Sequence, residues 1–271
     1  MSRIVLLSRP HNWQAVRTLD ECARRGLGVS AVILEPKTTR EKLRRFWRFL
    51  KSNGVHDTTR KILRTLRARR EFRHHITHGD ASALPLSVAT MAARMGVAVY
   101  NVGSHNDEQC ERVLRELAPD LILLAGTRII KPHIIERARV GCLNAHTGWL
   151  PEYRGVHANL WALLEGGRLG ITVHYVDPGV DTGAILLREQ LPVHTGDTLE
   201  ILETRMTAIC ARLMADAVLA IQAGTANPIP QAWNEGRQYR ALPFHKEQEV
   251  RRLLQNGASG LHHASESRGT S

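Results

Sequence analysis

The chain has few cysteines, and no two of them are close together. Cys22, Cys110, Cys142 and Cys210 are far apart in a sequence of 271 residues, and no Cys-x-x-Cys spacing occurs. This excludes a disulfide scaffold and a clustered thiolate metal centre. We therefore expect a cytoplasmic protein with reduced thiols and no bound metal. Cys142 lies within an apolar run, which favours a core position over a nucleophile.

Long hydrophobic runs are also missing. No run approaches the ~20 apolar residues of a membrane-spanning helix, so we expect no transmembrane segment. The apolar part of residues 1–10 is too short for a signal peptide and is expected to be a first buried strand. Because 43% of the residues are apolar, the chain can bury the core of one large α/β domain or two small ones.

Acidic residues are scarce in one segment. Residues 37–73 carry 14 Lys or Arg and only three acidic side chains, while the rest of the chain is balanced, so the formal charge of +11 belongs to this segment. Threonines at 38, 39, 58 and 59, with a break at Gly54, predict two basic amphipathic helices. In the first helix one face would carry Leu43, Phe46, Trp47 and Leu50, and in the second the inward residues would be Ile62, Leu63 and Leu66.

Two interpretations of this basic segment remain open. It is either a dock for a phosphorylated sugar, an acidic partner or an anionic membrane, or a solvated insertion that lies against the sheet.

Apolar runs and helical spacings alternate along the rest of the chain. We expect strands at 3–7, 29–34, 97–102, 121–125, 141–145, 169–176 and 184–193, and helices at 12–25, 86–95, 106–117, 132–138, 157–164 and 197–222, with caps at Asn12 and Asp197. This rhythm predicts an α/β fold with a Rossmann-like, doubly wound, mostly parallel sheet. The predicted domain spans residues 1–235 and contains the basic helical insertion 37–73. We expect the residues after Gly224 to be irregular. We expect 236–271 to be an extension whose last part, 257–271, is disordered.

Polar residues follow two of the expected strands. Asn144 and His146 end one apolar run, while His174 lies in the next and precedes Asp181-Thr182-Gly183. An amide, an imidazole and a carboxylate are the groups needed to move an acyl group onto an amine, because they stabilise an oxyanion and carry protons. Taken singly, each has a structural alternative: a strand-end cap for Asn144, a surface ring for His146, a turn for Asp181 and a half-buried strand position for His174.

The ordered set Asn-x-His, Leu-Pro-x-x-x-Gly, Thr-x-His and Asp-Thr-Gly resembles the formyltransferase superfamily that uses 10-formyltetrahydrofolate, over roughly residues 80 to 235. The resemblance implies that Asn144 and His146 polarise a formyl oxygen, that Asp181 assists proton transfer with a bound water, and that His174 lines the pocket. It also implies folate-binding backbone in the loop after the Leu-Ala-Gly strand, at Arg128, Ile129 and Ile130.

Departures from the family pattern indicate a subfamily. Residues 8–13 contain no glycine, and Pro10 removes a donor, unlike the phosphate loop of the purine-pathway members. About 48 residues follow the long helix, too few for the C-terminal barrel of the methionyl-tRNA members. The resemblance is therefore greatest to the amino-sugar N-formyltransferases and implies a small-molecule amine, often nucleotide-linked, as substrate.

Two roles are open for Arg154. Its side chain would either contact an anionic substrate or be solvated.

Two alternatives of other classes remain open. One is a formyl-folate hydrolase that uses the same residues on water. The other is a non-catalytic protein of this fold that uses its basic segment to bind an acidic partner. The sequence names neither the amine nor the oligomeric state.

Overall fold

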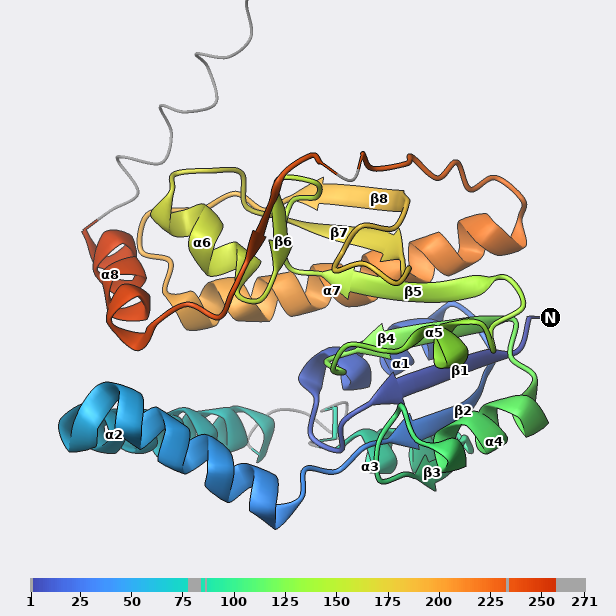
Figure 1. Cartoon of the computed structure of the whole chain (residues 1–271), viewed down its shortest axis with the longest axis horizontal. Helices are drawn as coiled ribbons and strands as arrows, with labels where there is room; N and C mark the ends of the chain where they lie inside the picture. Colours follow the sequence, from blue (N-terminus) through green and yellow to red (C-terminus); the bar gives the residue numbers. More distant parts are fainter. Residues whose placement is uncertain (1, 78–83, 86, 233, 257–271) are drawn as a thin grey trace, which may run out of the picture.

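A seven-stranded sheet in the order β3-β2-β1-β4-β5-β7-β8 forms the centre of the computed structural model, which describes residues 2–77, 84–85, 87–232 and 234–256 (Figure 1). Its strands are β1 (Ile4–Ser8), β2 (Val29–Leu34), β3 (Ala98–Asn101), β4 (Leu121–Ala125), β5 (Gly141–His146), β7 (Gly170–Tyr175) and β8 (Ile185–Gln190). The first five strands in this order, from β3 to β5, run parallel to one another, whereas β7 runs antiparallel to both of its neighbours, β5 and β8. The predicted mostly parallel α/β sheet is confirmed.

Helices cover both faces of the sheet. Side chains alternate along each strand, so in β1 Ile4 and Leu6 join one core with α1 (Trp13–Arg24), α3 (Val88–Arg94) and α7 (Leu199–Gln222). Val5 and Leu7 join the opposite core with α4 (Glu108–Leu117) and α5 (Pro132–Ile135). The sheet is therefore doubly wound, as expected.

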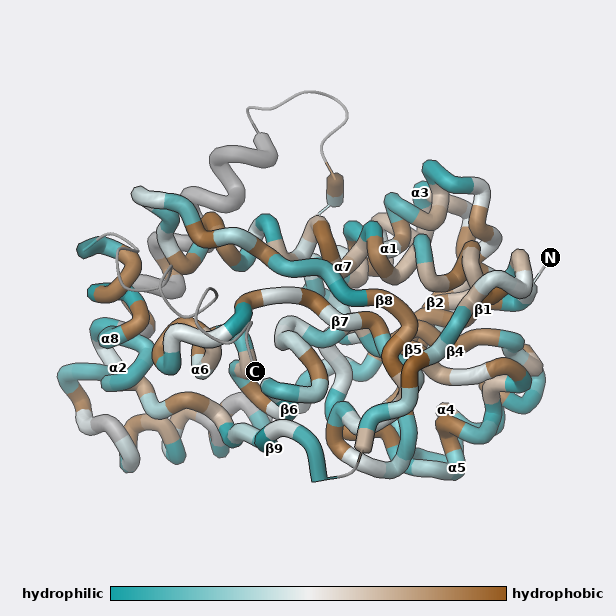
Figure 2. Tube along the Cα trace, turned by 90° about the horizontal axis from the view of Figure 1, so that it is seen from above, coloured by the Kyte–Doolittle hydropathy of each residue, from teal (hydrophilic) through white to brown (hydrophobic). Residues whose placement is uncertain are grey.

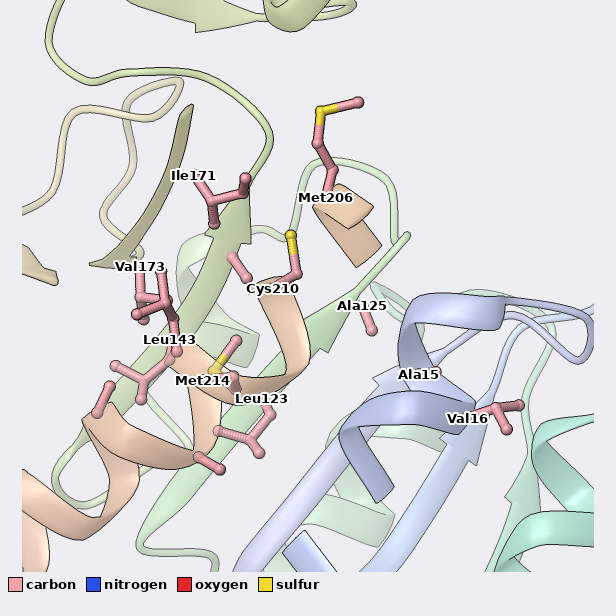
Figure 3. Packing of buried hydrophobic residues seen from close by; sticks show 14 of the residues in the cluster. Ala15, Val16, Leu123, Ala125, Leu143, Ile171, Val173, Met206, Cys210 and Met214 are labelled. Atoms are coloured by element: carbon pink, nitrogen blue, oxygen red, sulfur yellow. The ribbon is translucent and has the colours of Figure 1, made fainter. Parts of the chain in front are cut away.

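The packing of α7 on β5 and β7 determines where the polar residues of these strands point. One core cluster joins the two strands to the helix (Figure 3), and it includes Leu143, Ile171, Val173, Met206, Cys210 and Met214. Since neighbouring residues of a strand face opposite sides, Asn144, His146 and His174 project from the face turned away from α7.

The two predicted helix caps had different outcomes. Asn12 caps α1 by accepting the N–H of Ala15 at 2.8 Å, as expected. The cap of α7 was predicted one residue too early, because Thr198 accepts the N–H of Ile201. The carboxylate of Asp197 turns back instead and accepts the N–H of His194 at 2.7 Å.

The region after Gly224 is more ordered than predicted. β6 (Tyr153–Gly155) pairs in parallel with β9 (Arg237–Tyr239), and α8 (Phe244–Gln255) packs near α6 (Ala158–Leu164). The partner strand comes from a distant part of the chain, which is why local sequence patterns missed it. Leu86 and residues 257–271 lie outside the described residues, and the division into 1–235 and 236–271 stays a prediction.

The basic segment forms α2 (Thr39–Thr77), which is interrupted at Gly54 (φ 73°, ψ 176°) as expected. The second half begins directly after this break rather than at Thr58, whose hydroxyl donates to the Gly54 carbonyl. The inward orientation predicted for the second half is wrong, because its apolar residues are exposed: Ile62, Leu63 and Leu66.

α2 does not lie over the sheet. Both views place it at the end of the molecule that carries α8 (Figures 1 and 2), where the rings of Phe49 and Phe244 meet with centroids 5.6 Å apart. The physical reason is that other helices already cover both faces of the sheet. This removes the interpretation of the segment as an insertion packed against the sheet.

Candidate active site

β5 and β7 bring the predicted polar residues together on one face of the sheet. In this antiparallel pair Asn144 lies opposite His174 and His146 opposite Thr172, so the four side chains are neighbours. The loop after β7 folds back over them. It places Asp181 Oδ2 3.5 Å from His146 Nδ1 and Oδ1 3.5 Å from His174 Nε2. Asn144, His146, His174 and Asp181 form one group, the polar cluster.

His174 orients Asn144. Nδ1–H of His174 donates to the Tyr175 carbonyl at 2.7 Å, and its Nε2 lies 3.3 Å from Asn144 Nδ2, where it accepts one N–H of the amide. The second N–H on Asn144 Nδ2 is then left to donate to a ligand. Because Asn144 is partly exposed while His174 is buried, the amide is the member of this pair that a ligand reaches.

His146 is placed to accept a proton. Its Nε2–H donates to the Tyr153 carbonyl at 2.8 Å, which leaves Nδ1 of the neutral ring without a proton and facing Asp181. Burial lowers the pKa of His146 below its usual 6.5, although Asp181 and the Tyr153 carbonyl act in the opposite direction. The ring is therefore neutral near pH 7, and it has a second N–H, on the side that faces Asp181, only after Nδ1 is protonated.

Asp181 is ionised. Burial alone would raise the pKa of its carboxyl group, but His174, His146 and the N–H of Gly155 together hold it at about 2. The N–H of Gly155 donates to Oδ2 at 2.8 Å. Asp181 has a φ of 54°, in the left-handed region that Asp adopts more readily than most residues. A partly buried anion next to a neutral imidazole is an arrangement that stabilises a proton on that imidazole.

Two residues that support the cluster were not identified from the sequence. Gln231, beyond α7, donates from Nε2 to the carbonyls of Asp181 (3.2 Å) and Gly183 (2.6 Å). Thr172 accepts the N–H of Leu150 and donates to the Gly148 carbonyl, which holds the loop after β5. Thr172 could have been found from the Thr-x-His pattern, whereas a single glutamine in a Pro-containing stretch carries no such signal.

Arg154 is not solvated, and its contact with an anionic substrate stays a prediction. Its side chain is buried, and Nη2 donates to the Ala232 carbonyl at 3.0 Å. It therefore connects β6 to the segment that carries Gln231.

The loop after β4 lies beside the strand that carries Asn144, because Leu124 of β4 pairs with Asn144 of β5. In this loop Arg128 forms ion pairs with Glu35, at 3.0 Å, and with Glu41 of α2. Ile129 is exposed, with its carbonyl accepting from Asn106, and Ile130 is buried. The part of these three residues in binding a folate stays a prediction.

The four cysteines are core residues and do not belong to the polar cluster. All four are buried free thiols, and burial raises the pKa of Cys142, which packs in the core formed with α4 and α5. Among the described residues, no group of three or more His, Cys, Asp and Glu could hold a metal ion.

Comparison with known proteins assigns the chain to a family. The formyl transferase family model matches residues 2–218, a range that contains the whole polar cluster. The chain belongs to the formyl transferase family. The family expected from the ordered motifs is thereby confirmed.

Curated relatives within the formyl transferase family include two methionyl-tRNA formyltransferases. The one from Synechococcus sp. (strain JA-2-3B'a(2-13)) is 31% identical over 182 residues, which cover 66% of this chain and 56% of the relative. The one from Anaeromyxobacter dehalogenans (strain 2CP-C) is 36% identical over 155 residues, 56% of this chain and 49% of the relative. The chain thus spans about half the length of these relatives.

Solved structures of other formyl transferases share the fold. Phosphoribosylglycinamide formyltransferase from Anaplasma phagocytophilum aligns with a TM-score of 0.58 at 19% identity, covering 90% of this chain and 96% of that chain. The N-formyltransferase from Helicobacter canadensis, in complex with folinic acid and dTDP-3-aminofucose, aligns with a TM-score of 0.56 at 18% identity. The alignment covers 88% of this chain and 71% of that chain. At these identities the likeness concerns the fold alone.

Proposed function

We propose that this protein transfers a formyl group from 10-formyltetrahydrofolate to the primary amine of a small molecule, and that the amine belongs to a nucleotide-linked amino sugar. The observation that carries the proposal is the polar cluster, which joins an amide donor, a neutral imidazole and an ionised carboxylate on one face of the sheet. Membership of the formyl transferase family supports it.

Asn144 stabilises the negative charge that develops during the reaction. When the acceptor amine attacks the formyl carbon, the formyl oxygen becomes an oxyanion, and an N–H on Asn144 Nδ2 donates to it. A donor of this kind contributes a factor of ~10² to 10³ in rate. His174 preorganises the amide by accepting its other N–H.

His146 and Asp181 carry the proton. The acceptor nitrogen loses a proton as its bond to the formyl carbon forms, and the donor nitrogen gains one as its bond breaks. His146 Nδ1 accepts the first proton, Asp181 stabilises the resulting imidazolium, and the ring returns the proton to the leaving nitrogen. The protonated ring then carries a second N–H, at Nδ1 beside Asp181 Oδ2, and donation from this N–H to the oxyanion is the role implied by the family pattern.

The acceptor is the narrower part of the proposal. An amino sugar is supported by the departure from the purine pattern after β1, and by the sugar-nucleotide complex of the similarly folded Helicobacter canadensis protein. The curated relatives favour a second candidate, methionyl-tRNA.

One incubation distinguishes these acceptors. The full chain is mixed with 10-formyltetrahydrofolate and, in parallel, with nucleotide-linked amino sugars, with methionyl-tRNA or with no acceptor. We expect a mass gain of one formyl group on an amino sugar. Formylation of methionyl-tRNA alone, or folate release without an acceptor, would replace the proposed acceptor by tRNA or water. No turnover and no calorimetric binding of a stable folate analogue would refute formyl transfer itself.

A further inference from the structure

Both halves of α2 expose apolar side chains. Leu43, Phe46 and Trp47 are 55%, 40% and 58% exposed, and their spacing of three and four residues places them on one side of the first half. The rings of Phe46 and Trp47 meet edge to face with centroids 5.7 Å apart. The second half adds three apolar side chains, each between 42% and 58% exposed: Ile62, Leu63 and Leu66. Large apolar side chains that gather in the open along a helix mark an interaction site.

Cationic side chains accompany these apolar residues. Arg44, Arg48 and Lys51 are exposed and follow one another at spacings of four and three residues, so they form a second row along the first half of α2. Arg60 is exposed on the second half. Residues 37–73 carry the entire formal charge of +11 of the chain. An apolar face beside a strongly cationic face is the composition of a helix that lies in a membrane interface.

We propose that α2 binds anionic phospholipid bilayers as an interfacial element. The apolar side chains of its two halves enter the boundary between headgroups and acyl chains, where tryptophan is favoured. The arginines and lysines contact lipid phosphates, and each such residue adds to the attraction. Within the described part of the chain, no helix is long and apolar enough to cross a bilayer, so the element lies on the membrane.

The position of α2 in the fold suits this role. Phe49 packs against Phe244 of α8, and Glu41 pairs with Arg128 of the loop after β4. These contacts use other residues than the exposed apolar row. The helix is therefore connected to the body of the protein while Leu43, Phe46 and Trp47 stay available.

Other occupants fit the observations less well. A nucleic acid matches the charge, but phosphate contacts need no row of exposed Leu, Phe and Trp. A second copy of the chain matches the apolar row but would bring two strongly cationic segments together, which is unfavourable. Of these three occupants, an anionic bilayer is the one that is complementary to both the apolar and the cationic side chains.

Co-sedimentation of the full chain with lipid vesicles tests the proposal without any enzymatic assay, so it can fail independently of the proposed function. One vesicle is phosphatidylcholine alone, and the other is an equal mixture with phosphatidylglycerol. We expect binding to the mixed vesicles to be about tenfold or more tighter than to phosphatidylcholine, and to weaken with added salt.

A charge-preserving variant isolates the apolar contribution. Trp47→Ser combined with Leu63→Ser should weaken binding to the mixed vesicles by about tenfold or more. The matched control combines Ile201→Ser with Val140→Ser, which alters residues exposed by 45% and 42% outside α2, and should bind like the unmodified chain. Circular dichroism verifies that both variants fold.

Two results would overturn the inference. One is the absence of binding to mixed vesicles, or binding that the Trp47→Ser, Leu63→Ser variant leaves unchanged. The other is binding of an RNA duplex in place of vesicles, with equal affinity for the unmodified chain and this variant, which would assign the segment to nucleic acid.

Discussion

Gly155 donates its backbone N–H to Asp181 Oδ2 over 2.8 Å, and this bond joins the strand β6 to the loop that follows β7. Gly155 has a φ of +93°, and a Cβ at this position would lie 2.3 Å from the carbonyl oxygen of Tyr239 in β9. The pairing of β6 with β9 thus requires glycine here. Asp181 is held in place by a contact that depends on a third, distant segment.

Gly155→Ala should destabilise the fold and displace Asp181. The added methyl meets both a left-handed backbone and a carbonyl oxygen, so we expect the free energy of unfolding to fall by about 2 kcal/mol or more, as measured by urea denaturation. Gly166→Ala is the control, because Gly166 has a φ of +63° but nothing within 4 Å of the added Cβ. It should lose about 1 kcal/mol. Equal losses would show that the contact with Tyr239 is unimportant.

Asp181→Asn should reduce turnover by about 10² to 10⁴-fold, because a neutral amide cannot stabilise a proton on His146. The measurement is kcat for formyl transfer, with thermal unfolding as a check of folding. Asp177→Asn in the same loop is the control, since an asparagine Oδ1 can still accept from Gly179 and Thr182. Near-normal turnover of Asp181→Asn would exclude its proposed role.

The stability of the protein should depend on Asp181 at acid pH. The pKa of this carboxyl is about 2 in the folded protein and 3.8 ordinarily, so the native state binds fewer protons there than the unfolded state. The resulting stabilisation, on the order of 2 kcal/mol, is complete above pH 4 and is lost as the pH falls towards 2. The fall in unfolding free energy between pH 4 and pH 2 should therefore be smaller in Asp181→Asn than in the unmodified protein. A parallel decrease in both proteins would contradict the assignment.

His146 should titrate below pH 6.5, because burial disfavours its charged form. NMR of the ring C–H signals measures this directly. Asp181 opposes the effect of burial, so Asp181→Asn should move the His146 midpoint to still lower pH. A midpoint above 6.5 in the unmodified protein would mean that the carboxylate outweighs burial.

Gln231→Leu should lower kcat about tenfold and change KM less, because the side chain positions the Asp181 loop through the carbonyls of Asp181 and Gly183. Gln238→Leu, at an exposed position of β9, should leave both constants unchanged. If Gln231→Leu alters stability but not kcat, its role is structural only.

The order of the strands and helices was largely predictable from the sequence, because the signals involved are local. Alternating apolar residues determine which side of a strand faces the core, a side-chain oxygen at Asn12 caps α1, and Gly54 interrupts α2. The four polar residues of the cluster were also found in advance, since two adjacent strands carry three of them and the following turn carries the fourth.

Tertiary structure alone decided the contacts that give these residues their properties. The carbonyl of Tyr153 accepts the Nε2–H of His146, and Gly155 and Gln231 position Asp181. The apolar row of α2 is exposed because other helices occupy both faces of the sheet. The sequence by itself determined the repeating backbone pattern and the chemical groups present. It could not determine their partners, because these lie in segments far apart along the chain, and only folding sets their distances and burial.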